Sequence, residues 1–177
     1  SISVTAIANG LKRPERVVGM HYFNPAPVMA LVEVISGLAT SRAIAETVYE
    51  TASAWGKSPV YATSTPGFIV NRCARPFYAE GLRLYEERAA DIPTIDAIVR
   101  EAGGFRMGPF ELMDLIGNDV NFAVTNSVWN AYFNDPRYLP SVAQRELIDS
   151  GRLGRKSGRG YYDYALDAPK PAPATAC

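Results

Sequence analysis

The chain has 177 residues, of which 47% are hydrophobic and 20% charged, the composition of an ordinary water-soluble globular protein. Its 18 basic and 18 acidic residues cancel, so we expect no nucleic-acid partner and no anionic membrane surface as partner. No apolar run approaches the ~20 residues that span a bilayer, and the first residues lack the pattern of a signal peptide.

Few residues of the chain are suited to binding metal or forming disulfides. Cys73 and Cys177 are far apart in the sequence, so we expect free thiols in a reducing compartment, here the cytoplasm. His21 is the only histidine. One histidine and two cysteines offer no zinc-ligand spacing, so we expect no metal site.

Residues 1–64 have the pattern of an α/β unit. The expected elements are strands over 16–23, 31–35 and 57–62, and a helix that Thr40 or Ser41 begins and Gly56 ends. So few strands and one helix do not make a stable sheet alone. Parallel strands with helical crossovers need both faces covered, so we expect this segment to be part of a larger sheet.

Residues 65–165 have the pattern of an all-α domain. We expect helices over 68–89 with a kink at Pro76, over 95–102 with Asp91 or Thr94 as cap, and over 110–116, 120–133 and 142–149. Residues 166–177 are rich in proline and alanine, which predicts a linker or a tail.

His21 and Glu33 form the pair that points most directly to chemistry. Glu33 interrupts the apolar run 31–35, and a carboxylate in such a strand is costly to bury without a partner. The one imidazole lies on the neighbouring strand-like segment. A carboxylate that fixes the tautomer of an imidazole is a recurrent way to build a general base. The alternatives are a core histidine and a carboxylate at a strand edge.

Four groups of motifs in order resemble the 3-hydroxyacyl-CoA dehydrogenase family. They are His21-Tyr-Phe-Asn-Pro25 with Leu31-Val-Glu-Val-Ile35, then Thr65-Pro-Gly-Phe-Ile-Val-Asn-Arg72, then Met107-Gly-Pro-Phe-Glu-Leu-Met-Asp114, and last Gly154-Arg-Lys-Ser-Gly158 with Gly160-Tyr-Tyr162. The resemblance covers about residues 1–164. Further runs resemble the members that serve phenylacetate degradation more than those of fatty-acid oxidation: Leu38-Ala-Thr40, Ser53-Ala-Trp-Gly-Lys57, Asn71-Arg-Cys-Ala-Arg-Pro76 and Asp119-Val-Asn-Phe-Ala-Val-Thr125.

The resemblance implies a fold in which an NAD-binding Rossmann domain precedes a helical domain that dimerises. Residues 1–64 would then be the C-terminal part of a truncated Rossmann domain, and residues 65–165 the dimerisation and substrate domain. The chain has no Gly-x-Gly-x-x-Gly, the motif that binds the dinucleotide phosphates in a Rossmann domain. It therefore resembles a C-terminal fragment of a member of this family. Ser1 matches the second serine of a pair whose first is the family's active-site residue, so Ser1 does not inherit that role.

The resemblance also implies a reaction and residues that perform it. NAD would accept a hydride from a 3-hydroxyacyl-CoA, with 3-hydroxyadipyl-CoA or 3-hydroxybutyryl-CoA as the expected substrate. His21 would be the general base, Glu33 its partner, and Asn71 the amide that positions the substrate and the histidine. Asn24 and Lys156 match residues that contact the cofactor. The alternatives are a helix-face polar residue for Asn71, a turn residue for Asn24 and a solvated loop lysine for Lys156.

Two arginines are candidates for substrate recognition. An adipyl chain ends in a carboxylate, and arginine can bind a carboxylate through two hydrogen bonds. Arg75 lies four residues after Asn71, hence on the same face of a helix, and Arg72 lies next to Asn71. A surface ion pair is the alternative for Arg75.

Two alternatives to the leading function stay open. The parent could be a related dehydrogenase of hydroxy acids that carry no CoA, or this chain could be a non-catalytic dimerisation and substrate-binding fragment. We expect a homodimer through the helical domain, because apolar residues such as Phe110, Leu112 and Trp129 exceed what so small a bundle can bury.

Overall fold

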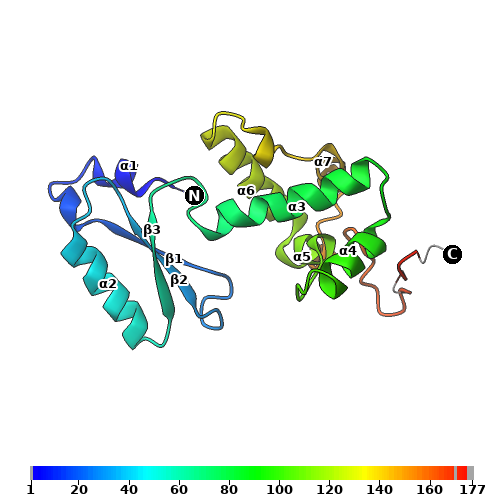
Figure 1. The fold of residues 1–177 in the computed structure, drawn as a ribbon, viewed down its shortest axis with the longest axis horizontal. Coiled ribbons are helices and arrows are strands. Elements are labelled where there is room, and N and C mark those ends of the chain that lie inside the picture. The colour runs from blue at the N-terminus through cyan, green and yellow to red at the C-terminus, as the bar shows by residue number, and fades with distance from the viewer. Residues whose placement is uncertain (1, 170, 175–177) are drawn as a thin grey trace. The chain divides into compact units, whose positions relative to one another are not determined.

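The chain folds into two compact units in a computed structural model that describes residues 2–169 and 171–174. The units are Ser1–Arg72 and Cys73–Cys177. The first contains a three-stranded sheet, and the second contains only helices and turns among its described elements (Figure 1). The expected fold class, an α/β unit followed by an all-α unit, is confirmed.

The sheet of the first unit has the order β1-β2-β3. Its strands are β1 (Val18–Tyr22), β2 (Leu31–Ser36) and β3 (Ser58–Thr63), and its helices are α1 (Val4–Ala8) and α2 (Arg42–Ala54). β1 and β2 run antiparallel, whereas β2 and β3 run parallel and are joined through α2. Ser41 begins α2 by accepting a hydrogen bond from the N–H of Ile44.

Strand β2 is the buried centre of this unit. Val32 and Val34 are 0% exposed on one face, and Glu33 and Ile35 are 0% and 2% exposed on the other. Ile35 packs with Val4 of α1, and this packing leaves no room for a side chain at position 19 on the adjoining strand, where the residue is glycine. A Cβ atom on Gly19 would lie 2.9 Å from Cγ2 of Val4. Helix α1 therefore covers the sheet face to which Glu33 belongs.

The second unit is built from five α-helices and connecting turns among the described residues. They are α3 (Val70–Glu86), whose first turn belongs to the first unit, α4 (Ile92–Glu101), α5 (Pro109–Ile116), α6 (Asn118–Ala131) and α7 (Val142–Asp149). Their core consists of Tyr78, Leu82, Ile95, Phe110 and Met113. Phe110 is 0% exposed, so the expectation that it remains at the surface for a dimer interface is wrong.

Four helix starts differ from the sequence prediction. Helix α3 begins at Val70, two residues after the expected start, and α5 begins at Pro109, one residue before it. Helix α4 begins at Ile92, not at Ile95, because Asp91 accepts a hydrogen bond from the N–H of Thr94 at 2.9 Å. Pro93 fits this first turn, where a backbone N–H has no partner within the helix. Helix α6 begins at Asn118, directly after Gly117, two residues earlier than expected.

Two buried aspartates hold the second unit together. Asp114 accepts hydrogen bonds from the amide of Asn118, from the N–H groups of Tyr161 and Tyr162, and from the hydroxyl of Tyr164, at 2.8–3.0 Å. Asp96 accepts the N–H groups of Phe110 and Glu111 at the start of α5, and the hydroxyl of Tyr162. The segment after α7 is thus fixed onto α4 and α5. Burial outweighs these bonds for Asp96 and raises its pKa.

The C-terminal segment is partly described. The N–H of Ala174 donates to Oγ1 of Thr94 at 2.8 Å, so this part of the expected tail contacts α4. Cys73 is a free, exposed thiol, whereas Cys177 lies outside the described residues. None of the described helices is long and apolar enough to cross a membrane.

Candidate active site

His21 and Glu33 face each other across the antiparallel pair β1 and β2. Their Cα atoms are register partners, so both side chains leave the same face of the sheet. Nδ1 of His21 lies 2.7 Å from Oε2 of Glu33. Because an ionised carboxylate only accepts, Nδ1 carries the proton and donates it, which leaves Nε2 as the basic nitrogen of the neutral ring.

The second oxygen of Glu33 is held by the beginning of α3. Oε1 accepts hydrogen bonds from the N–H groups of Ile69 and Val70, both at 2.9 Å. These N–H groups have no partner inside the helix, and the N-terminus of a helix favours a negative charge. The wholly buried carboxylate is therefore stabilised by charge-assisted bonds on both oxygens.

The imidazole is held in place by aromatic rings. The ring of His21 meets Phe23 edge-on at a centroid distance of 4.9 Å, and Phe68 at 5.4 Å. Its side chain is 32% exposed, whereas that of Glu33 is 0% exposed. The pair thus has an accessible member that can exchange a proton and an inaccessible member that orients it.

The turn Thr65-Pro66-Gly67 delivers α3 to Glu33. Gly67 has φ +77°, and a Cβ atom there would lie 2.9 Å from the backbone nitrogen of Arg72. Only glycine fits this close, left-handed position. The two amides that bind Glu33 were missed in the sequence, because backbone groups carry no residue-type signal. The glycine before a helix was the available clue.

Three further candidates lie in the same unit as the dyad. Asn24 is exposed and lies in the loop after β1, three residues beyond His21. Asn71 is the second residue of α3 and directly follows Val70, whose N–H binds Glu33. Arg72 is exposed on the same first turn. The chain thus connects each of these side chains to the dyad by a short segment.

The other two candidates belong to the second unit. Arg75 is 4% exposed and therefore not part of a surface ion pair. Its Nη1 donates to the carbonyl of Asn121 and to Oγ1 of Thr125 at 3.1 and 3.0 Å, which joins α3 to α6. Burial lowers the pKa of this guanidinium. Lys156 binds Oδ1 of Asp119 at 2.6 Å and holds the pKa of that carboxyl below its usual range.

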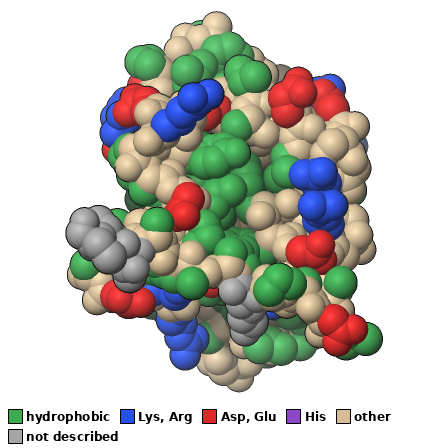
Figure 2. All heavy atoms as spheres, turned by 90° about the vertical axis from the view of Figure 1, so that its right-hand side faces the viewer, with side chains coloured by type: hydrophobic (Ala, Val, Ile, Leu, Met, Phe, Trp, Pro, Cys, Tyr) green, Lys and Arg blue, Asp and Glu red, His purple; other side chains and the backbone are tan. Residues whose placement is uncertain are grey.

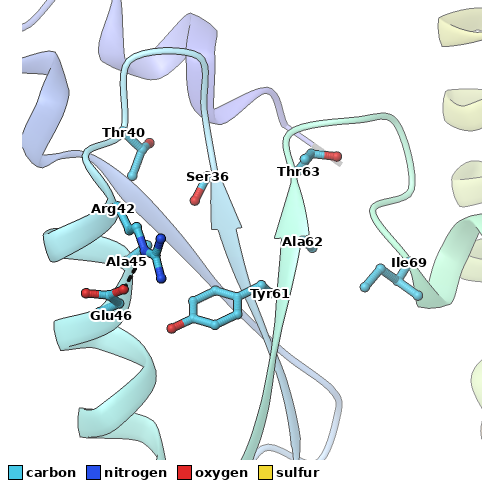
Figure 3. Close-up of a pocket in the computed structure, with 9 residues that line it drawn as sticks. All are labelled: Ser36, Thr40, Arg42, Ala45, Glu46, Tyr61, Ala62, Thr63 and Ile69. Atoms are coloured by element: carbon cyan, nitrogen blue, oxygen red, sulfur yellow. Dashed lines mark hydrogen bonds and ion pairs between the residues drawn. The ribbon is translucent and has the colours of Figure 1, made fainter.

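A hollow of about 670 Å³ lies between α2 and β3, and Ile69, whose N–H binds Glu33, is among its lining residues. Figure 3 shows that residues of α2, the outer strand β3 and the β2–α2 connection surround it. Its charged members, Arg42 and Glu46, bind each other. None of its lining residues is a sequence-predicted site residue. No group of acidic, histidine and cysteine side chains among the described residues is suited to hold a metal ion.

Two sequence profiles match the chain in succession. The NAD-binding domain of 3-hydroxyacyl-CoA dehydrogenase matches residues 1–65, and the C-terminal domain of 3-hydroxyacyl-CoA dehydrogenase matches residues 67–164. Together these matches account for the sheet unit and for the helices. They also identify the first unit as part of a nucleotide-binding domain.

Known proteins agree with these matches. The chain is 60% identical over 167 residues to a 3-hydroxyadipyl-CoA dehydrogenase of Escherichia coli, covering 94% of this chain and 35% of that protein. It is 41% identical over 164 residues to a 3-hydroxybutyryl-CoA dehydrogenase of Clostridioides difficile, covering 93% and 58%.

Solved structures give the same result. The crystal structure of 3-hydroxybutyryl-CoA dehydrogenase from Escherichia coli matches with a TM-score of 0.94 at 56% identity, over 100% of this chain and 38% of that one. The chain spans about a third to three fifths of the relatives it matches. It belongs to the 3-hydroxyacyl-CoA dehydrogenase family.

Proposed function

We propose that this chain supplies the proton-transfer site of an NAD-dependent dehydrogenase that oxidises a 3-hydroxyacyl-CoA to the 3-oxoacyl-CoA. The observation that carries the proposal is the 2.7 Å contact between Nδ1 of His21 and the wholly buried Glu33. Family membership and the names of the relatives support the reaction class.

His21 acts as the general base. Nε2 takes the proton of the substrate 3-hydroxyl as the hydride leaves C3, which turns the alcohol into a ketone. Glu33 stabilises the imidazolium that forms, while two backbone N–H groups hold its other oxygen in place. In the reverse direction His21 returns the proton.

Bound NAD supplies the hydride acceptor. The residues of this chain fit the nicotinamide end of such a cofactor, because Asn24 offers an exposed amide on the loop that follows His21. Lys156 is a second candidate, a cation for the cofactor phosphates or ribose. The amide of Asn71, next to the residue that binds Glu33, would position the substrate oxygen.

The function is tested in the full-length protein by following NADH formation. Wild type should oxidise 3-hydroxyacyl-CoA thioesters and not the corresponding free hydroxy acids. His21→Gln should lower kcat about 10³-fold and remove the acidic limb of the pH profile, with unchanged circular dichroism. Wild-type kcat in the folded His21→Gln variant would contradict the proposal. Turnover of free acids would instead support the related class without CoA.

For the acyl chain we propose 3-hydroxyadipyl-CoA, with 3-hydroxybutyryl-CoA as the alternative, because relatives carry both names. Arg72 and Arg75 are the candidates to bind the distal carboxylate of the adipyl group. Exposure favours Arg72, whereas Arg75 is engaged with α6. Arg72→Ala should lower kcat/KM for 3-hydroxyadipyl-CoA at least tenfold more than for 3-hydroxybutyryl-CoA. Equal losses would exclude Arg72.

We further propose a homodimer through the helical unit. Figure 2 shows hydrophobic side chains gathered along the middle of one face, with charged groups on either side. Exposed apolar residues of this unit include Leu115, Val120, Phe133 and Val142. Such exposure is typical of an interaction surface. Light scattering should give twice the mass of one full-length chain, and a monomer would refute the proposal.

A further inference from the structure

The loop of residues 23–30 joins the two strands that carry the dyad. It leaves β1 two residues after His21, carries Asn24, and enters β2 two residues before Glu33. Its internal hydrogen bonds are two contacts from the N–H groups of Val28 and Met29 to the carbonyl of Pro25. Three other carbonyls of the loop, those of Ala26, Pro27 and Met29, contact a side chain that lies elsewhere in the sequence.

That side chain is Lys57. Its Nζ lies 2.7 Å from the carbonyl oxygen of Ala26, 2.9 Å from that of Met29 and 3.5 Å from that of Pro27. An ammonium group has three N–H donors, which equals the number of carbonyl oxygens around it. Lys57 thus holds both ends of a four-residue segment that begins two residues after Asn24.

The sheet brings Lys57 to this place. β2 and β3 run parallel with Leu31 opposite Ser58, so the residue before β3 lies beside the end of the loop that enters β2. The N–H of Ser58 donates to the carbonyl of Ala30 at 2.8 Å and extends the pairing by one residue. In Figure 1 the α2–β3 connection and the β1–β2 loop lie at the same end of the sheet.

Lys57 is also suited to its place by charge. It follows α2 directly after Gly56, and its own N–H donates to the carbonyl of Ala52. Cations are favoured at the C-terminus of a helix. Among the hydrogen bonds of the described residues, the ammonium group of Lys57 donates only to neutral carbonyl oxygens of the loop. Its positive charge therefore orients the backbone of the loop.

We infer that Lys57 is a positioning residue for cofactor binding: it fixes the 23–30 loop so that Asn24 is presented to the nicotinamide. This inference rests on the proposed function. Lys57 takes no part in proton transfer, because it binds the loop backbone and not the dyad. Loss of the ammonium should weaken the binding of NAD and leave the proton-transfer step unchanged.

The test compares Lys57→Met with Lys12→Met in the full-length protein. Lys12 is an exposed lysine of the same unit and serves as the matched control. Lys57→Met should raise KM for NAD about tenfold, lower kcat less than threefold and keep the shape of the pH profile, whereas Lys12→Met should change none of these. Lys57→Arg, which keeps a cation with several donors, should recover part of the affinity.

Chemical rescue separates positioning from stability. In Lys57→Ala, ethylammonium ions can enter the vacated cluster of carbonyls and should lower KM for NAD again, whereas tetramethylammonium, which has no N–H donor, should not. An unchanged KM for NAD in Lys57→Met, or a loss confined to thermal stability, would overturn the inference. Failure of the wild type to oxidise any 3-hydroxyacyl-CoA would instead refute the proposed function.

Discussion

Two wholly buried carboxylates organise the two units, and they differ in what they hold. Glu33 in the sheet unit and Asp114 in the helical unit are both 0% exposed and engaged on both oxygens. The donors of Asp114 are an amide, two backbone N–H groups and a tyrosine hydroxyl, none of which titrates near neutral pH. One donor of Glu33 is an imidazole, which is one third exposed.

Burial and the number of hydrogen bonds therefore do not distinguish the carboxylate of the proposed active site from a structural one. The chemistry of the donors does. Where every donor is neutral and fixed, the carboxylate joins segments of chain. Where one donor can gain and lose a proton at an accessible position, the same arrangement orients a general base.

Replacing Glu33 with glutamine should give the largest effect. An amide has one accepting atom, so it either meets the N–H groups of Ile69 and Val70 with its NH₂ group or donates to Nδ1 of His21 and reverses the tautomer. We expect kcat in the full-length protein to fall about 10³-fold. Glu50→Gln, an exposed position on α2, is the control and should keep wild-type kcat. Similar values for the two variants would contradict the role of Glu33.

Replacing Asp114 with asparagine should lower the stability of the fold and leave kcat nearly unchanged. The new NH₂ group would face the N–H donor of Tyr161 in one orientation and that of Tyr162 in the other, in a wholly buried site. We expect the free energy of unfolding in urea to fall by about 3 kcal/mol, and kcat to stay within about threefold in the folded protein. The control Asp149→Asn, at an exposed ion pair, should cost less than about 1 kcal/mol.

The partly buried tyrosines around Asp114 let us predict how the stability of the helical unit changes at alkaline pH. Burial raises the pKa of Tyr161 well above its usual 10.0, and burial and Asp96 raise that of Tyr162. Their contribution to stability is complete below pH about 10, where both states are protonated, and is lost as the pH rises, because only the unfolded chain then releases the proton.

The loss for Tyr161 should reach at most about 1.4 kcal/mol per pH unit, and solvent screening makes it smaller for the half-buried Tyr162. Urea titrations at a series of alkaline pH values measure the slope. Tyr161→Phe should reduce the slope, and an unchanged slope would show that this hydroxyl does not ionise on unfolding.

The smallest effect is expected for Lys156→Met. Lys156 and Asp119 are 45% and 38% exposed, so their ion pair should contribute less than about 1 kcal/mol to unfolding. If Lys156 also contacts the cofactor, KM for NAD should rise several-fold with kcat nearly unchanged. If the free energy of unfolding changes and KM for NAD does not, Lys156 stabilises the helical unit and does not contact the cofactor.

Much of the local structure could be predicted from the sequence. Strands β1, β2 and β3 follow from apolar, β-rich runs between prolines and glycines, and Ser41 and Asp91 are capping residues whose type announces a helix start. The start of α4 was missed because Pro93 was not counted as a residue of a first turn. The pairing of His21 with Glu33 was predictable because a lone carboxylate in an apolar strand requires a partner.

The contacts between backbone groups and distant side chains could not be predicted and emerge only in the folded chain. The N–H groups that bind Glu33, the carbonyls that surround Lys57 and the N–H groups of Tyr161 and Tyr162 that bind Asp114 come from segments 28–48 residues away. The three strands, the helices other than α1, the family resemblance and the pairing of His21 with Glu33 could be read from the sequence, because hydrophobic period and residue type are local. Backbone donors and acceptors are the same at nearly every residue, so only the folded chain decides which of them a buried charge meets.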